Sequence, residues 1–245
     1  MAITDHDTTD GIARAIEAGS SYGIEVIPGI ELGTQINDCE IHILGYFIDY
    51  RQKWLQEQLA DIISSRLGRA KMMAENLKQI YGFDILFEEI LQEAKEGAVT
   101  RPHIARILIK KGYASSMEDA FRRYIGEDCP AYVGRYHLSP KEGIELITKA
   151  GGVPVLAHPG LLACPERLEE LVNLGILGIE AYYSKHTLAQ SKKYIEIGQK
   201  FGLVITGGTD CHGELVDGEP IIGDIRVDRK VVEGLEQLSS HGDFA

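Results

Sequence analysis

The sequence lacks several features that would assign it to a particular class of protein. No apolar run approaches the length of a membrane-spanning helix, and no internal repeat or low-complexity tract is present. The four cysteines are widely spread, with no paired zinc-finger spacing: Cys39, Cys129, Cys164 and Cys211. This cysteine usage favours a reducing compartment. We therefore expect a cytoplasmic protein without membrane contacts.

Positive charge is also scarce. The 245 residues include 25 Lys and Arg against 37 Asp and Glu, for a formal net charge of -12. This balance argues against wide contact with a phosphate backbone, although a basic pocket could still bind one nucleotide. Nucleic acid is therefore a candidate substrate and not a coating partner. The length allows one barrel-sized domain or a smaller domain with an insertion.

Strand and helix patterns alternate through most of the chain, as in α/β proteins. The expected strands are 1–4, 24–27, 31–35, 40–48, 153–157, 178–183 and 203–206. The expected helices of the alternating part are 10–22, 140–150, 165–174, 188–201 and 229–238. The alternation stops between residues 53 and 125, where the period stays helical. We expect residues 1–52 and 126–245 to form a barrel-type domain, and residues 53–125 to form a helical cap.

A glycine-rich segment follows the last expected strand, Thr206-Gly207-Gly208-Thr209-Asp210-Cys211-His212-Gly213. It places Asp210 and His212 just beyond the carboxyl end of that strand. Two residues apart in an extended chain, their side chains point the same way. Oxygen and nitrogen ligands suit Zn, Mn or Fe, so this pair is a candidate for part of a metal site.

Other metal-competent side chains lie beside expected strands in the same way. Any single histidine at such a place is more often a hydrogen-bonded structural residue, and Glu31 by itself could be a solvated turn residue. The joint pattern favours a metal site, because separate strand ends converge at one mouth of a β/α barrel. The candidate metal ligands are His6, Glu31, His42, His158, Asp210 and His212.

Basic residues near helix starts are candidates for phosphate binding. Arg101 and His103 lie in the first turn of a helix that begins at Thr100, where free N–H groups attract anions. An ordinary helix cap or surface ion pair explains such residues equally well. The candidate substrate-binding residues are Arg101, His103, Arg135 and His186.

Five segments closely resemble the motifs of the polymerase and histidinol phosphatase (PHP) superfamily of metal-dependent phosphoesterases. They are Ala2-Ile3-Thr4-Asp5-His6-Asp7-Thr8, Pro28-Gly29-Ile30-Glu31, Glu40-Ile41-His42-Ile43-Leu44-Gly45-Tyr46, Leu156-Ala157-His158-Pro159-Gly160 and Gly207-Gly208-Thr209-Asp210-Cys211-His212-Gly213. Two further segments, Thr100-Arg101-Pro102-His103 and Tyr182-Tyr183-Ser184-Lys185-His186-Thr187, resemble one branch. That branch comprises nucleoside 3',5'-bisphosphate phosphatases that also act as 5'-3' exoribonucleases on short RNA.

The resemblance implies a distorted seven-stranded β/α barrel with a helical insertion domain and up to three divalent metal ions. Manganese is the expected ion, with zinc, iron and magnesium as alternatives. The implied reaction is hydrolysis of a nucleotide 3'-phosphate, or of short RNA from the 5' end, by attack of a metal-bound hydroxide. The catalytic residues would be His6, His158 and Asp210.

One part of the family ligand set has no counterpart here. The family carries a His-x-His pair and an aspartate on its first strand, some thirty residues before the Thr-Asp-His motif at Thr4-Asp5-His6. We therefore expect a truncated barrel that lacks its first strand, holds fewer metals and has low activity. Two alternatives remain open: a small phosphomonoesterase like histidinol phosphatase, or a catalytically incomplete protein that binds phosphate or a nucleotide. The oligomeric state is unknown.

Overall fold

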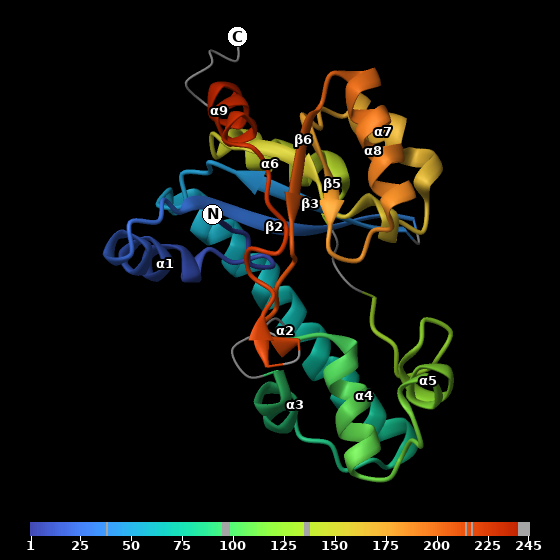
Figure 1. Cartoon of the computed structure of the whole chain (residues 1–245). Coiled ribbons are helices and arrows are strands. Elements are labelled where there is room, and N and C mark those ends of the chain that lie inside the picture. The colour runs from blue at the N-terminus through green and yellow to red at the C-terminus, as the bar shows by residue number, and fades with distance from the viewer. Residues whose placement is uncertain (38, 95–98, 135–137, 214, 217, 240–245) are drawn as a thin grey trace. The chain divides into compact units, whose positions relative to one another are not determined.

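The computed structural model describes residues 1–37, 39–94, 99–134, 138–213, 215–216 and 218–239 (Figure 1). The chain divides into two compact units, Met1–Gln56 with His137–Ala245, and Glu57–Tyr136. These bounds differ from the expected ones chiefly at residues 126–136, which cluster with the helical unit. That the barrel and the cap are separate domains stays a prediction.

A mixed six-stranded sheet, curled into a half-barrel, forms the centre of the first unit. Its strands follow the chain in the order β1 (Ala2–Ile3), β2 (Ile27–Ile36), β3 (Cys39–Tyr46), β4 (Val153–Leu156), β5 (Gly178–Tyr183) and β6 (Val204–Gly208). β1 pairs with β2 in parallel, β3 runs antiparallel to both β2 and β4, and β4, β5 and β6 are parallel. A closed seven-stranded barrel is not observed, since β1 and β6 are the two edges of the sheet among the described residues.

The sequence pattern predicted two strands, 24–27 and 31–35. The structure has the single strand β2, which begins at Ile27, so residues 24–26 lie outside it. Pro28 and Gly29 had been interpreted as a turn, but they lie inside the strand and pair with its neighbours. A Cβ atom at position 29 would lie 2.7 Å from the Thr4 Cγ2 atom and 2.9 Å from the Gly45 carbonyl oxygen. The glycine therefore allows three segments to approach closely, and the chain does not turn there.

Helices cover the sheet in the first unit. They are α1 (Asp10–Ser21), α6 (Pro140–Lys149), α7 (Leu168–Asn173), α8 (Leu188–Phe201) and α9 (Arg229–Leu238). α6 packs on β2, β3 and β4, whereas α8 packs on β5 and β6 (Figure 1). α6 begins as its capping box predicts, because Ser139 and Glu142 satisfy each other's backbone N–H groups. Short 3-10 turns at Pro159–Leu161 and Pro165–Arg167 and a small hairpin of β7 (Leu215–Val216) and β8 (Glu219–Pro220) complete this unit.

The second unit is helical and has a hydrophobic core of its own. Its elements are most of α2 (Lys53–Tyr81), then α3 (Phe87–Ala94), α4 (Arg101–Lys110), α5 (Met117–Ala120) and a π-helical turn at Phe121–Ile125. The buried side chains of this core include Met73, Leu77, Ile90, Ile104 and Leu108. A separate core is the physical requirement for a segment that folds as a unit.

The cysteines differ from the expectation. Cys39, at the start of β3, forms a disulfide with Cys164, and their Cα atoms lie 6.1 Å apart. The expectation of a reducing compartment rested on the wide spacing of the cysteines in the sequence, and the disulfide between Cys39 and Cys164 weakens this argument. Cys129 and Cys211 are free thiols. Among the described residues, no helix is both long enough and apolar enough to cross a membrane.

Candidate metal centre

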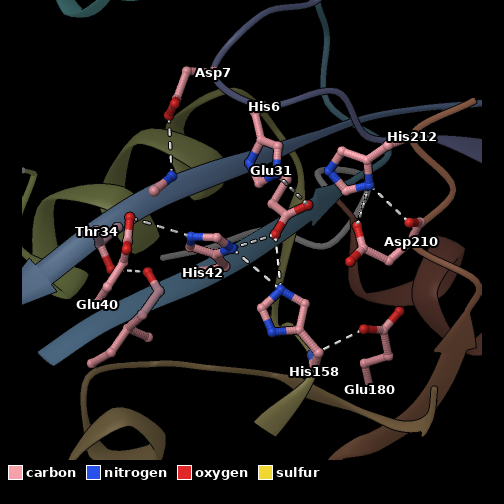
Figure 2. A network of polar contacts seen from close by, with 12 residues as sticks. His6, Asp7, Glu31, Thr34, Glu40, His42, His158, Glu180, Asp210 and His212 are labelled. Atoms are coloured by element: carbon pink, nitrogen blue, oxygen red, sulfur yellow. Dashed lines mark hydrogen bonds and ion pairs between the residues drawn. The ribbon is translucent and has the colours of Figure 1, made fainter. Parts of the chain in front are cut away.

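The Glu31 carboxylate is the centre of a polar cluster at one end of the sheet (Figure 2). Its side chain is only 5 % exposed and contacts three imidazoles. The Oε1 atom lies 2.7 Å from His42 Nδ1 and 3.1 Å from His158 Nε2, and the Oε2 atom lies 3.7 Å from His6 Nε2. A buried carboxylate among three imidazoles is a typical donor set for a divalent metal ion.

Backbone pairing explains how His6 and Glu31 meet. Beyond the end of β1, a parallel bridge joins the two residues. The Asp7 N–H donates to the Glu31 carbonyl at 2.9 Å, and the Glu31 N–H donates to the Asp5 carbonyl at 3.1 Å. The Asp7 carboxylate in turn accepts the N–H of Gly33 at 3.1 Å. The segment after β1 is therefore hydrogen-bonded to β2 on both sides of the histidine, which fixes His6 beside Glu31.

His158 enters the cluster from β4. The N–H of Ala157 donates to the His42 carbonyl at 3.1 Å, so the chain leaves β4 directly beside His42. His158 Nε2 lies 3.2 Å from His42 Nδ1. Two imidazole nitrogens and one carboxylate oxygen thus lie within hydrogen-bonding distance of one another, an arrangement that a shared cation would stabilise.

Asp210 and His212 complete the cluster from the segment after β6. The His6 and His212 ring centroids lie 5.7 Å apart, and His212 Nδ1 lies 3.5 Å from Asp210 Oδ1. The same nitrogen lies 2.9 Å from the Asp210 carbonyl oxygen, which only accepts, so Nδ1 carries the hydrogen and Nε2 is the ligand atom of the neutral ring. The structure therefore brings all six candidate ligands together. The His212 side chain is 49 % exposed, so the cluster opens to solvent on this side.

The electrostatics of the cluster show how the charged groups compensate one another. Burial would raise the pKa of Glu31, but hydrogen bonds from His158 and His42 outweigh it and hold this pKa well below the usual range. Burial acts to lower the pKa of His42, but hydrogen bonds to Glu31 and Glu40 raise it to about 9. Burial lowers the pKa of His6. A divalent cation bound here would take the place of the proton on His42.

The donor atoms fit a divalent metal. One atom each from His6, Glu31 and His42 lies within 4.8 Å of the other two. His158 Nδ1 is buried without a hydrogen-bond partner among the described residues, so its ring is held through Nε2 towards the carboxylate. Nitrogen and oxygen donors of this kind suit Mn, Zn and Fe.

Three side chains of this site are additional to the sequence-based candidates. Glu180 on β5 is buried and accepts the His158 N–H at 2.9 Å, and burial raises its pKa to about 7. The Tyr183 hydroxyl donates to Asp210 Oδ2 at 3.0 Å, and Glu40 Oε1 lies 3.5 Å from His42 Nε2. Strict alternation along β5 would place Glu180 and Tyr182 on one face, but a register shift between these two residues breaks the alternation, and no local sequence signal indicates it.

The four candidate substrate-binding residues lie in different places. His186 is near the cluster, but its ring nitrogens contact backbone: Nε2 lies 3.0 Å from the Gly160 nitrogen and Nδ1 lies 3.1 Å from the Ala181 oxygen. In the helical unit, Arg101 pairs with Glu127 at 3.5 Å, and His103 Nδ1 accepts the Thr100 N–H at 3.0 Å. Arg135 lies outside the described residues. Substrate binding by these residues stays a prediction.

Taken with its curled mixed sheet, this cluster of four imidazoles and two carboxylates is typical of metal-dependent hydrolases. The chain is 42 % identical over 164 residues to the 5'-3' exoribonuclease Rnm of Escherichia coli (strain K12), a match covering 65 % of this chain and 55 % of that protein. It is 31 % identical over 218 residues to the 3',5'-nucleoside bisphosphate phosphatase of Chromobacterium violaceum, covering 86 % of this chain and 76 % of that protein. The matched part thus spans about half the length of the first relative and three quarters of the second.

The fold comparison agrees with these relatives. A crystal structure from Bifidobacterium adolescentis, of a protein assigned as a metal-dependent phosphoesterase, superposes with a TM-score of 0.77 at 29 % identity. The match covers 99 % of this chain and 86 % of that one. No protein-family model matches the chain. The chain belongs to the PHP superfamily of metal-dependent phosphoesterases.

Proposed function

We propose that this protein is a metal-dependent phosphoric ester hydrolase that removes the 3'-phosphate of nucleoside 3',5'-bisphosphates and degrades short RNA from the 5' end. The observation that supports the proposal is the cluster of imidazoles and carboxylates around Glu31. The two relatives, a nucleoside bisphosphate phosphatase and an exoribonuclease, support the choice of substrate.

Within this proposal the cluster has a buried side and an open side. Glu31 orients His6, His42 and His158 from the buried side. On the open side, His212 faces solvent beside the less exposed Asp210, and the substrate phosphate approaches there. Bound divalent ions supply Lewis-acid stabilisation of the phosphoryl oxygens and a nucleophile from water at neutral pH. The Tyr183 hydroxyl orients the Asp210 carboxylate through its hydrogen bond.

Within this proposal Arg101 and His103 are candidates for binding a phosphate group in the helical unit. Arg101 carries a planar guanidinium suited to bidentate contact with phosphate. The Phe121 and Tyr132 rings lie 5.4 Å and 5.5 Å from its Cζ atom and hold the guanidinium in place. His103 accepts a backbone N–H through Nδ1, so Nε2 of the neutral ring is a donor for an anion. Two anchored donors of this kind are suited to binding a phosphate group.

We further propose manganese as the working ion and the cytoplasm, where such nucleotides and RNA fragments occur, as the location. Imidazole and carboxylate donors are both acceptable to manganese. The relevant partners are then small phosphorylated nucleotides and short RNA.

The experiment is phosphate release from adenosine 3',5'-bisphosphate with Mn²⁺, with the product identified by phosphorus NMR. We expect loss of the 3'-phosphate and a 5'-monophosphate product. Parallel reactions contain a 5'-phosphorylated RNA trinucleotide and p-nitrophenyl phosphate. Hydrolysis of p-nitrophenyl phosphate alone would favour a general phosphomonoesterase. Saturable binding of the bisphosphate, seen by calorimetry without turnover at saturating Mn²⁺, would favour the binding-protein alternative.

A further inference from the structure

His158 has an unusual backbone conformation. Its φ of 25° and ψ of 60° lie in the left-handed region, which residues other than glycine rarely adopt. Such a conformation persists only where surrounding contacts hold it. The left-handed turn directs the chain out of β4 and presents the imidazole to Glu31 and His42.

A buried carboxyl group holds the first residue of this turn. Glu180 Oε2 accepts the N–H of His158 at 2.9 Å, and the side chain is almost fully buried. A Cβ atom at position 208 would lie 2.8 Å from Glu180 Oε1, so Gly208 leaves the space that the carboxyl group needs. The Glu180 carboxyl group thus bonds to the residue after β4 and lies against Gly208 at the end of β6, the strand that leads to Asp210.

The next residue is held by a buried tyrosine. The Tyr194 hydroxyl donates to the Pro159 carbonyl at 3.0 Å, and the Tyr194 side chain comes from α8. Pro159 has no N–H of its own, so this carbonyl is its one backbone group that can be anchored by a hydrogen bond.

The third residue is held by His186. Because the Ala181 carbonyl can only accept, His186 Nδ1 donates to it, and Nε2 of the neutral ring accepts the Gly160 N–H at 3.0 Å. A Cβ atom at position 160 would lie 2.6 Å from His186 Cδ2 and Nε2, so only glycine allows this approach. Both ring nitrogens therefore make backbone hydrogen bonds.

We propose that three side chains are positioning residues for the metal centre: Glu180, His186 and Tyr194. They contact the backbone of residues 158, 160 and 159 respectively, and together we call them the clamp. The clamp holds His158 in its left-handed conformation, with Nε2 towards Glu31. In this assignment His186 acts through the backbone and does not contact the substrate. The inference rests on the proposed function for its link to catalysis.

The central test uses His186→Phe, which keeps an aromatic ring but removes both hydrogen bonds. We expect Mn²⁺ affinity, measured by calorimetry, to fall about tenfold, the cost typical of losing a group that orients a ligand. The visible spectrum of the Co²⁺-substituted protein should change, and kcat should fall while KM for adenosine 3',5'-bisphosphate stays constant. His186→Gln carries an acceptor at similar reach and should restore part of the affinity.

A second pair of variants removes one oxygen atom each. Tyr194→Phe deletes the hydroxyl that holds Pro159 and, like His186→Phe, should lower Mn²⁺ affinity. Tyr182→Phe deletes a hydroxyl from a side chain that is 42 % exposed on β5, and should change nothing. Circular dichroism verifies that each variant is folded.

The outcomes separate this inference from the proposed function. Unchanged Mn²⁺ affinity and Co²⁺ spectrum in both His186→Phe and Tyr194→Phe would overturn the clamp, even in an active enzyme. A raised KM for His186→Phe with unchanged metal binding would assign His186 to the substrate and also overturn it. If the wild-type protein binds Mn²⁺ but hydrolyses no phosphate ester, the proposed function is wrong and the clamp is still judged from metal binding. Absence of Mn²⁺ and Co²⁺ binding by the wild type would overturn both.

Discussion

Glu31 and His42 are diagonal neighbours across the β2–β3 pair. The residue directly opposite His42 is Gly33, and the residue opposite Glu31 is Leu44. Because Gly33 has no side chain, the imidazole of His42 has room to lean along the sheet and bring Nδ1 to 2.7 Å from Glu31 Oε1. The antiparallel register of two strands thus creates the shortest contact of the metal cluster.

The first prediction concerns Glu31, the carboxylate that the three histidines share. Glu31→Gln keeps the size of the side chain but removes its charge. We expect loss of bound Mn²⁺ and a fall in phosphate release of more than about a hundredfold, since groups that only orient a ligand already contribute about ten- to a hundredfold. Elemental analysis and phosphate release measure the two effects.

The matched control for this variant is Glu145→Gln. Glu145 lies on α6, is 64 % exposed and forms an i,i+4 ion pair with Lys141 at 3.8 Å. This variant should retain full metal content and activity. Equal losses in both variants would show that the effect of Glu31→Gln is not specific to the cluster.

The second prediction concerns substrate binding in the helical unit. Arg101→Ala should raise KM for adenosine 3',5'-bisphosphate more than KM for p-nitrophenyl phosphate, because a guanidinium binds phosphate groups and the bisphosphate carries two of them. Arg106→Ala is the control, since Arg106 is an exposed residue of the same helix. Steady-state kinetics with both substrates provide the test, and an unchanged KM for the bisphosphate in Arg101→Ala would show that Arg101 does not bind it.

The third prediction is a pH dependence of stability in the helical unit. The Asp119 carboxylate accepts the Ser115 N–H at 3.0 Å and pairs with Arg122 and Arg123 at 3.0 Å and 3.2 Å. The Ser115 N–H is the largest of the influences that lower the pKa of Asp119 to about 2 from an ordinary value of 3.8. The contribution of the ionised Asp119 carboxylate to folding stability is fully present above the unfolded-state pKa and is lost as pH falls towards 2.

Asp119→Asn should therefore unfold at lower urea concentration than the wild type at pH 7, and the difference should shrink between pH 4 and pH 2. Urea titrations followed by circular dichroism at several pH values measure this difference. Glu118→Gln alters the neighbouring exposed carboxylate and serves as the control. A difference that stays constant down to pH 2 would contradict the assignment to the Asp119 carboxylate.

The fourth prediction tests whether the two compact units are separate domains. Leu77 is fully buried in the helical core, and Leu77→Ala should destabilise that unit by about 2–5 kcal/mol. We expect faster amide hydrogen exchange throughout residues 57–136, with Mn²⁺ affinity unchanged. Lys78→Ala, at the adjacent exposed position, should leave exchange unaltered. If Leu77→Ala also weakened Mn²⁺ binding, the units would unfold together and the separation into a barrel and a cap would be wrong.

Local patterns predicted most of the secondary structure. The limits of β5, α8 and α9 agree with the sequence-based limits, because capping residues and hydrophobic periodicity are short-range signals. The candidate ligands were identified for a related reason. Each lies beside a short apolar run, and the ends of such runs are where side chains of different strands can meet.

Long-range pairing decided the features of the fold that local patterns did not predict. Whether β3 runs antiparallel to β2 and β4, and whether Pro28 and Gly29 turn or continue β2, depends on partners that no local window contains. Cys39 and Cys164 are 125 residues apart in sequence, and only the fold brings them together.

The site shows the same division between local and long-range information. The sequence by itself determined which donor atoms the chain offers and that they lie in or beside strands. Only the tertiary structure decided that Glu31 is their common centre and that Glu180 accepts the backbone N–H of His158. It also decided that His186 uses both ring nitrogens on backbone groups. The physical reason is that a side chain's chemistry is local, whereas its hydrogen-bond partners are set by strand register and by turns that close over more than a hundred residues.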